Sequence, residues 1–330
     1  MNMKITFKDV GQGDSILLEW TANGVDKIGI IDCNRKNKQN PIVEYLKNST
    51  YNQIEFIVLS HPHSDHYSGF VELFSYIEKN NITVLDFYHS LFILGEEYFK
   101  YLHLVEIDTE AIELLKQIVE IAGNLRDNNI IKRINSVVEN MRIDLTDTIY
   151  LKALSPSHFE AECYMEKMKY GGPSDKKKLS SAANYLSTLF KLVVADKYCL
   201  LTSDCEPETF TRIIADERHE TFRAKTLFVG QLPHHGAEKN FVPEFWNFVN
   251  NQEERHAIIS AGTNFKYKHP HFPVLKGIHE GGYKIHATNI VHGMEDFIEY
   301  LSNMVKTTTV LDSISDLVSD YSGGEKSFYL

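Results

Sequence analysis

Residues 59–66 read Leu59-Ser60-His61-Pro62-His63-Ser64-Asp65-His66 and close the short apolar run 54–60. Such a run is typical of a buried strand, so it predicts a strand that presents these polar residues at its carboxyl end. Zinc and similar ions prefer imidazole nitrogen and carboxylate oxygen ligands. His61 and His63 can point to one side of an extended chain, while Asp65 and His66 reach a second position. Four ligands in six residues therefore predict two adjacent metal ions, as in two-metal hydrolases.

Two further stretches place metal-binding residue types after apolar segments. Asp204 follows the stretch 199–203, and the pair His234 and His235 follows 227–229. Strand ends gather binding residues in α/β sheets, so Asp204 is expected to bridge the two ions, although an N-cap before a helix is the alternative. One histidine of the pair is expected to bind metal, with His235 favoured, and the other to lie near the substrate. The alternative is one core histidine and one surface histidine.

Composition and charge narrow the class of protein. The 330 residues carry a formal net charge of -11, which argues against bulk, sequence-independent binding of duplex nucleic acid. The chain begins without the apolar core of a signal peptide, and no apolar run approaches a membrane span. The four cysteines are scattered, without a CxxC pair, which suits a reducing cytoplasm. We therefore expect a cytoplasmic protein without a membrane contact.

The order of expected elements predicts the architecture. Two strand-rich halves, each with polar residues at strand ends, favour a single α/β (α+β) domain over 1–330 with two sheets face to face and helices outside. Helical periodicity over 105–141 predicts a helical insertion at about 91–147. This insertion is either a set of ordinary surface helices or a cap that shapes the substrate site. The segment 307–330 is expected to be a flexible tail or a partner-binding strand.

The motifs together resemble the metallo-β-lactamase superfamily, and in particular the branch with the hydrolase domain of the DNA-uptake protein ComEC. The His cluster is highly specific for the superfamily, and the glycine motif and the double His are moderately specific for the branch. The matching stretches occur in the family's order and are Asp9-Val10-Gly11-Gln12-Gly13-Asp14, Ile31-Asp32, the cluster 59–66, Asn184 with Ser187, Leu200-Leu201-Thr202-Ser203-Asp204, Pro233-His234-His235-Gly236, and Asn264 through His269-Pro270-His271.

The resemblance implies a four-layer αββα metallo-β-lactamase sandwich with the metals at one edge of both sheets. It implies that His61 and His63 bind one metal and that Asp65 and His66 bind the other. Asp204 would bridge the two metals. Asp32 would contact a ligand and orient the loop, while Gln12 and Asp14 would lie near the mouth of the site. Ser203 stands where the family usually has glycine, and Ala237 where it often has serine.

The third histidine of the first metal is the open position in this assignment. The resemblance takes it from a strand before the bridging Asp, which makes His158 the candidate and His89 the weaker alternative. Asn184, Ser187 and His271 are expected to contact the substrate.

A lysine run and one further histidine add candidate site residues. The run Lys176, Lys177, Lys178 is either a solvated loop or a basic rim that attracts an anionic substrate. His269 is either a catalytic group or a structural histidine.

The predicted function is a two-metal hydrolase, with a phosphodiesterase or nuclease acting on nucleic acid or a nucleotide favoured. Two divalent ions, zinc favoured and manganese open, would bring the pKa of a water near neutrality, and the metal-bound hydroxide would attack the phosphorus. Asp65 would orient this nucleophile, and His234 or His269 would protonate or bind the leaving group. The alternatives are a lactone, thioester or β-lactam hydrolase and, in another class, a metal-stabilised binding or signalling module with a relict site. A protein partner in a larger system stays open.

Overall fold

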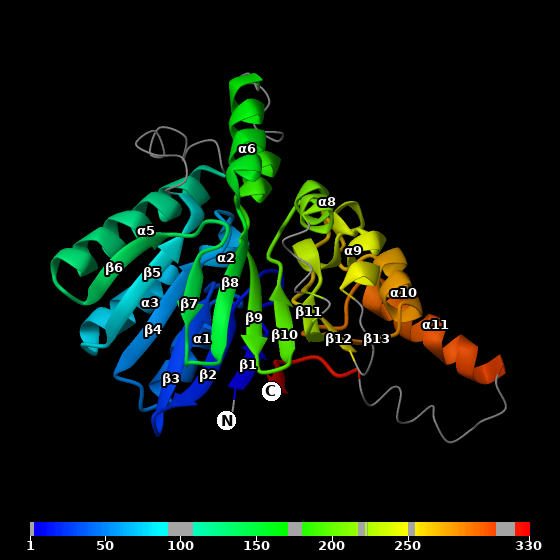
Figure 1. Ribbon diagram of the computed structural model, residues 1–330, viewed down its shortest axis with the longest axis horizontal. Helices are drawn as coiled ribbons and strands as arrows, with labels where there is room; N and C mark the ends of the chain where they lie inside the picture. Colours follow the sequence, from blue (N-terminus) through cyan, green and yellow to red (C-terminus); the bar gives the residue numbers. More distant parts are fainter. Residues whose placement is uncertain are drawn as a thin grey trace.

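Two sheets form the centre of the molecule (Figure 1). The structure, a computed structural model, describes residues 3–91, 108–170, 180–216, 222, 224–249, 255–307 and 321–330. In spatial order the first sheet contains β14 (Lys326–Tyr329), β1 (Met3–Phe7), β2 (Ile16–Ala22), β3 (Val25–Ile31), β4 (Gln53–Leu59), β5 (Thr83–His89) and β6 (Ile131–Ser136). The second contains β13 (Tyr283–Ala287), β12 (Arg255–Ile259), β11 (Thr226–Gln231), β10 (Lys197–Leu201), β9 (Leu189–Val194), β8 (Ile149–Ser155) and β7 (Arg142–Asp144).

The two sheets share one apolar core between their inner faces. Ile5 and Leu18 of the first sheet pack in this core with Leu192 and Val229 of the second. Successive strand residues point to opposite faces, so Leu17, next to Leu18, packs instead in the core under the helices. Because both faces of each sheet are buried, each sheet needs a helix layer on its outer side.

Helices supply both outer layers (Figure 1). On the first sheet these are α1 (Pro41–Lys47), α3 (Phe70–Lys79) and α5 (Thr109–Asp127). On the second they are α8 (Pro207–Ala215), α9 (Pro243–Phe248), α10 (Phe272–Glu280) and α11 (Gly293–Thr307). In α3, Phe70, Leu73, Phe74 and Ile77 are buried at the spacing of one helix face. The order helix, sheet, sheet, helix confirms the predicted four-layer αββα class.

The segment predicted as a helical insertion at about 91–147 contains strands as well as a helix. Its part 92–107 lies outside the described residues. The helix α5 ends at Asp127, because Asn129 has a φ of 65°, a left-handed conformation that asparagine tolerates. The chain then forms β6 beside β5 and β7 beside β8, one edge strand for each sheet. The helical periodicity expected as far as Met141 is therefore wrong beyond α5, since strand pairing prevails there.

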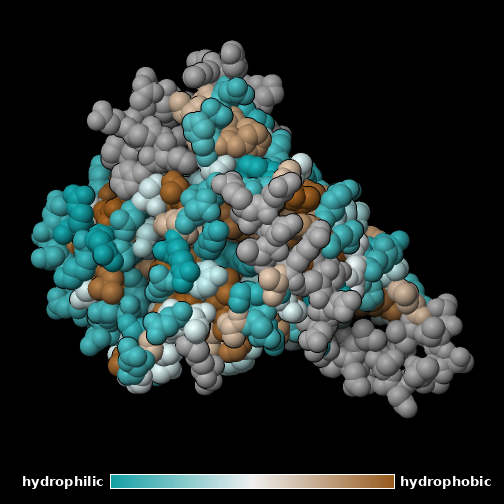
Figure 2. All heavy atoms as spheres, in the orientation of Figure 1, coloured by the Kyte–Doolittle hydropathy of each residue, from teal (hydrophilic) through white to brown (hydrophobic). Residues whose placement is uncertain are grey.

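The end of the chain also belongs to the sandwich. Lys326–Tyr329 form β14, which pairs antiparallel with β1 of the same chain. No described helix is both long enough and apolar enough to span a membrane. On the face seen in Figure 2, hydrophilic residues cover most of the described surface, and hydrophobic residues lie in small separate areas.

The strand directions bring the polar motifs to one edge. β3 to β6 are parallel neighbours in the first sheet, and β10 to β13 are parallel neighbours in the second. The residues 61–66 follow β4, Asp204 follows β10, and His234 and His235 follow β11. Binding sites lie at the carboxyl ends of such strands, and here both sheets contribute.

Candidate metal centre

The loop after β4 turns from extended chain into one helical turn. His61 lies in the extended part, and His63 caps the short helix α2 (Ser64–Tyr67). The turn brings Asp65 and His66 round to a different direction from His61 and His63. The side chains of His61 and His66 are fully buried, whereas that of Asp65 is 32% exposed. The loop therefore offers two pairs of candidate ligands in two directions, and Asp65 and His63 are its partly exposed members.

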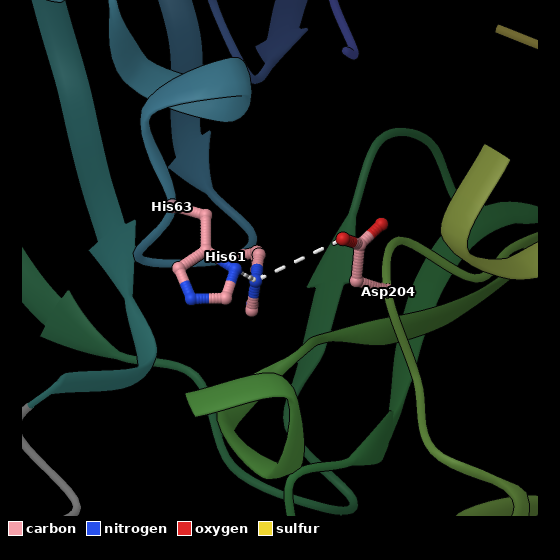
Figure 3. Close-up of side chains that lie close together, drawn as sticks. All are labelled: His61, His63 and Asp204. Carbon is pink, nitrogen blue, oxygen red and sulfur yellow. Dashed lines mark hydrogen bonds and ion pairs between the residues drawn. The ribbon is translucent and has the colours of Figure 1, made fainter. Parts of the chain in front are cut away.

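The first ligand group consists of His61, His63 and Asp204 (Figure 3). The Nε2 atom of His61 lies 2.5 Å from Nδ1 of His63 and 3.9 Å from Oδ2 of Asp204. The other ring nitrogens are held from behind. Nδ1 of His61 lies 2.9 Å from the hydroxyl of Ser187, and Nε2 of His63 lies 3.0 Å from the backbone oxygen of Ser180. Among the described residues, no further His, Cys, Asp or Glu joins this group of three.

The second ligand group consists of Asp65, His66 and His235, with Asp204 on its border. Nε2 of His235 lies 3.4 Å from Asp65 and 3.6 Å from Oδ1 of Asp204. Nε2 of His66 lies 3.4 Å from the same Oδ1. These two nitrogens and Oδ1 of Asp204 are buried and have no hydrogen-bond partner among the described residues. Buried polar atoms left unpaired are costly, so their convergence fits a bound cation.

Both histidines of the second group are oriented by hydrogen bonds on the far side of the ring. Nδ1 of His66 lies 2.8 Å from Oδ2 of Asp32, and Nδ1 of His235 lies 2.7 Å from the backbone oxygen of Ser260. With the proton on Nδ1, each ring presents the lone pair of Nε2 to the group, as metal-binding histidines do. Asp32 thus contacts the ring of His66, one of the candidate ligands.

The glycine motif supports the metal loop from behind. Gly13 has a φ of 121°, and a Cβ on it would come within 2.1 Å of the backbone oxygen of Asp65 and 2.2 Å of Nδ2 of Asn34. The backbone N–H of Asp14 donates to the same oxygen of Asp65 at 3.1 Å. Only glycine combines this φ with such a close approach, so the motif is a support for the loop. Asp14 is buried rather than at the mouth of the site, and its carboxylate lies close to Asp204 and His235.

Gln231 is a site residue that the sequence did not reveal. Its Nε2 donates to Oδ2 of Asp14 at 2.8 Å, and its Oε1 accepts from the backbone N–H of Thr202 at 3.0 Å. It therefore connects the glycine motif to the loop that carries Asp204. The one signal in the sequence is a polar residue at the end of a predicted apolar strand. Gln12 lies next to this region, where its backbone oxygen accepts from Nδ2 of Asn34 at 2.7 Å.

The carboxylates around the second group favour protonation of its histidines when no metal is bound. Burial alone would lower the pKa of His235, but the carboxylates of Asp204, Asp65 and Asp14 raise it to about 9. Burial likewise opposes protonation of His66, but Asp204 and Asp32 raise its pKa well above the usual range. Burial raises the pKa of Asp204, and the charges of the surrounding histidines lower it well below the usual range. The second group is thus suited to positive charge, which a divalent ion would provide.

His234 and His269 lie on the other side of Asp204. Nδ1 of His234 is 3.6 Å from Oδ2 of Asp204, and the His234 and His269 rings are 5.4 Å apart. Burial lowers the pKa of His234 to about 4 and that of His269 to about 3. These lowered pKa values favour the neutral form of both rings near pH 7. The ring of Tyr267 stacks on His269 and holds it in place.

The structure contradicts the prediction that His158 is the third ligand. It is the first residue of α6 (His158–Tyr170), its side chain is 89% exposed, and its Nε2 lies 3.1 Å from Glu162. The weaker alternative, His89, is buried at the end of β5 but belongs to neither ligand group among the described residues. Among the described residues, the first group therefore consists of the two histidines and Asp204 as residues that could hold a metal ion.

The expected substrate residues divide into four cases. The hydroxyl of Ser187 lies 2.9 Å from Nδ1 of His61 and so supports that ring. His271 uses both ring nitrogens on backbone groups: Nδ1 accepts from the N–H of Glu238, and Nε2 lies 3.1 Å from the oxygen of Tyr267. Asn184 donates to Glu206 at 2.6 Å and lies 3.3 Å from Nδ1 of His234, close to the centre. Residues 176–178 lie outside the described part of the chain.

Comparison with solved structures returns proteins of the metallo-β-lactamase fold. They include a diphosphatase of the PhnP family (12% identity over 85% of this chain and 94% of that chain, TM-score 0.42). YhfI from Bacillus subtilis matches at 10% identity over 99% and 100% of the two chains, with a TM-score of 0.41. Zinc-bound PqqB from Methylobacterium extorquens matches at 8% identity over 86% and 97%, with a TM-score of 0.43. No protein-family model and no curated protein matches the chain. The fold class therefore rests on the sheet order and layers described above.

Proposed function

We propose that the protein is a hydrolase that uses two divalent metal ions. The observation that supports this most strongly is the pair of adjacent ligand groups that meet at Asp204, with Oδ2 toward His61 and Oδ1 toward His66 and His235. When bound, two such ions would lower the pKa of a water molecule and neutralise charge on a substrate oxygen. The buried, unpaired nitrogens of the second group are consistent with a resident ion there.

Asp65 is the residue suited to hold the nucleophile. It is the most exposed of the two ligand groups' carboxylates, and His235 lies 3.4 Å from one of its oxygens. Burial opposes ionisation of Asp65, but the nearby positive charges of His66 and His235 hold its pKa below the usual range. An ionised carboxylate accepts hydrogen bonds only, so Asp65 can orient an attacking water by accepting a hydrogen bond from it.

His234 and His269 are suited to stabilise the substrate or leaving group. Both are neutral at neutral pH because burial lowers their pKa values to about 4 and about 3. Nδ1 of His234 lies near Asn184 and Asp204. A neutral ring that accepts at Nδ1 donates from Nε2, which gives a hydrogen bond to a developing negative oxygen. We assign the two rings to binding of that oxygen.

We favour a phosphodiester as the substrate, in nucleic acid or in a nucleotide. Support comes from the resemblance of the motifs to the ComEC branch and from neutral N–H donors beside a dication site, which suit an anionic phosphate. The metal ligands alone do not choose the substrate, because one fold serves many reactions. Hydrolysis of a lactone, thioester or β-lactam uses the same ligand set.

Hydrolysis of bis-p-nitrophenyl phosphate by the zinc- or manganese-loaded protein tests the proposal. We expect turnover by the wild type, at least about a hundredfold loss in Asp65→Asn, and no change in Asp144→Asn, an exposed carboxylate on β7. Parallel assays use a lactone, a thioester and a β-lactam. Hydrolysis of one of these alone would replace the phosphodiester. Bound metal without turnover of any ester would refute the hydrolase and favour a binding module.

A further inference from the structure

We propose that Ser203 is a positioning residue that fixes the Asp204 loop against the metal loop 61–66. The inference rests on the metal centre of the proposed function, and it concerns how that centre is held together. Ser203 immediately precedes Asp204, and Ser60 immediately precedes His61. Both serines are buried, and Ser60 follows β4 of the first sheet whereas Ser203 follows β10 of the second.

The backbone of Ser203 is in a conformation that disfavours serine. Its φ is 46°, in the left-handed region where a side chain beyond Cα is strained and glycine is not. Such strain persists only where the surrounding structure holds it, and it clusters at functional sites. Serine at this position therefore requires a compensating contact, and the hydroxyl provides one.

The hydroxyl of Ser203 begins a chain of hydrogen bonds that ends at a metal ligand. Its Oγ lies 2.8 Å from Oγ of Ser60, whose own proton is donated to Oδ2 of Asp32. Ser60 has a single hydroxyl proton, so Ser203 must be the donor between the two serines. Oδ2 of Asp32 also accepts from Nδ1 of His66 at 2.8 Å. The chain keeps the His66 proton on Nδ1 and leaves the lone pair of Nε2 for a metal.

The backbone of Ser203 is held by two other motifs. Its N–H lies 3.4 Å from Oε1 of Gln231, and its carbonyl accepts from the N–H of His234 at 3.0 Å. Each polar atom of Ser203 thus contacts a different residue of the site. The position of the neighbouring Asp204, between His61 and His66, depends on all three contacts. Without the hydroxyl, the link between the two sheets' loops is lost while the backbone contacts stay.

Two variants separate the hydroxyl from the backbone strain. Ser203→Ala removes the hydroxyl and keeps the strain, whereas Ser203→Gly removes both. Metal affinity is measured by chelator competition with zinc and with manganese, and unfolding of the metal-free protein is measured by denaturant. We expect both variants to bind metal at least about tenfold more weakly, as is typical for the loss of residues behind a ligand. We also expect metal-free Ser203→Gly to be more stable than Ser203→Ala.

Three further variants complete the test. Ser203→Thr keeps the hydroxyl and is expected to stay within about threefold of wild-type affinity despite lower stability. Ser60→Ala combined with Ser203→Ala is expected to lose less affinity than the sum of the single losses, because both break one chain. Ser75→Ala, whose hydroxyl bonds within α3, is the control and is expected to bind metal as the wild type does.

The inference would be overturned if Ser203→Gly bound metal as tightly as the wild type. It would also be overturned if the variants ranked in metal affinity as they rank in stability. The readout needs no substrate, so it can fail independently of the proposed function. A wild type that binds metal but hydrolyses no ester refutes the function alone, and the affinity comparison still decides the role of Ser203. A wild type that binds no divalent metal overturns both.

Discussion

His235 couples the protonation of the centre to the stability of the protein. In the metal-free fold its pKa is raised to about 9, because the carboxylates around it outweigh the effect of burial. A histidine whose pKa is raised by folding stabilises the fold below its unfolded value of about 6.5, and this contribution is lost as the pH rises toward 9. A metal ion needs the same nitrogen without its proton, so metal binding strengthens over that range.

We therefore predict that the metal-free protein loses stability between pH 6.5 and 8. Above about pH 8, Lys191 opposes the trend, because burial lowers its pKa to about 8. Chemical denaturation of the chelator-treated wild type and of His235→Gln across this window measures the effect. The variant is expected to show a flatter profile. Equal slopes for the two proteins would mean that His235 is not protonated in the metal-free fold.

The ligand residues differ in how far the sequence could predict them. His61, His63, Asp65 and His66 lie within one loop, so their short spacing is sufficient to predict a shared site. The role of Gln231 depends on contacts with Asp14 and Thr202, 217 and 29 residues away, which no local pattern encodes. His158 was misassigned because a resemblance gives the order of ligands but not the direction in which a helix start faces.

At the level of elements, the glycine motif between β1 and β2 supports the loop after β4. Gly11 and Gly13 both have positive φ, 74° and 121°. A Cβ on Gly11 would meet nothing within 4 Å, whereas one on Gly13 would meet Asp65 and Asn34. The two glycines therefore separate the effect of backbone conformation from that of close approach.

We predict that Gly11→Ala costs about 1–2 kcal/mol in the free energy of unfolding, from backbone strain alone. Gly13→Ala is expected to cost about 1–3 kcal/mol more, because the methyl group displaces the backbone at Asp65. Only Gly13→Ala is expected to weaken metal binding. Denaturant unfolding and chelator competition measure both effects. Equal metal affinity in the two variants would show that the loop does not depend on this support.

The strands were easier to predict than the helix layer. Buried strands such as β4 and β10 are short apolar runs that end in polar residues, and the sequence shows both features. Residues 131–136 carry apolar residues at a helical spacing as well, but pairing with β5 makes them a strand. The preceding Asn128 and Asn129, which end α5, were the signal against a continuous helix.

For the whole molecule, the centre connects two sheets that also meet through apolar packing and through hydrogen bonds such as the one from Gln231 to Asp14. The loop 61–66 belongs to the first sheet, whereas Asp204 and His235 belong to the second. An ion bound only by the folded state stabilises it by mass action, by about 2.7 kcal/mol at a hundred times the dissociation constant. We predict that excess chelator lowers the Tm of the wild type and that zinc or manganese restores it. An unchanged Tm would show that no ion links the two sheets.

The fold class follows from the pattern of apolar residues along the strands and from the polar residues at the strand ends. Local sequence encodes both features. The substrate depends on the mouth of the site, to which distant loops contribute. The layers could therefore be predicted from the sequence, but the chemistry at the mouth could not.

Anomalous diffraction from crystals grown with zinc or manganese tests the central claim most directly. The account predicts two peaks roughly 3.5–4 Å apart, on either side of Asp204. One is expected beside His61 and His63, and the other beside Asp65, His66 and His235. Crystals of Asp204→Asn under the same conditions are expected to lose or weaken both peaks. The absence of peaks at these residues, or peaks only elsewhere on the molecule, would contradict the account.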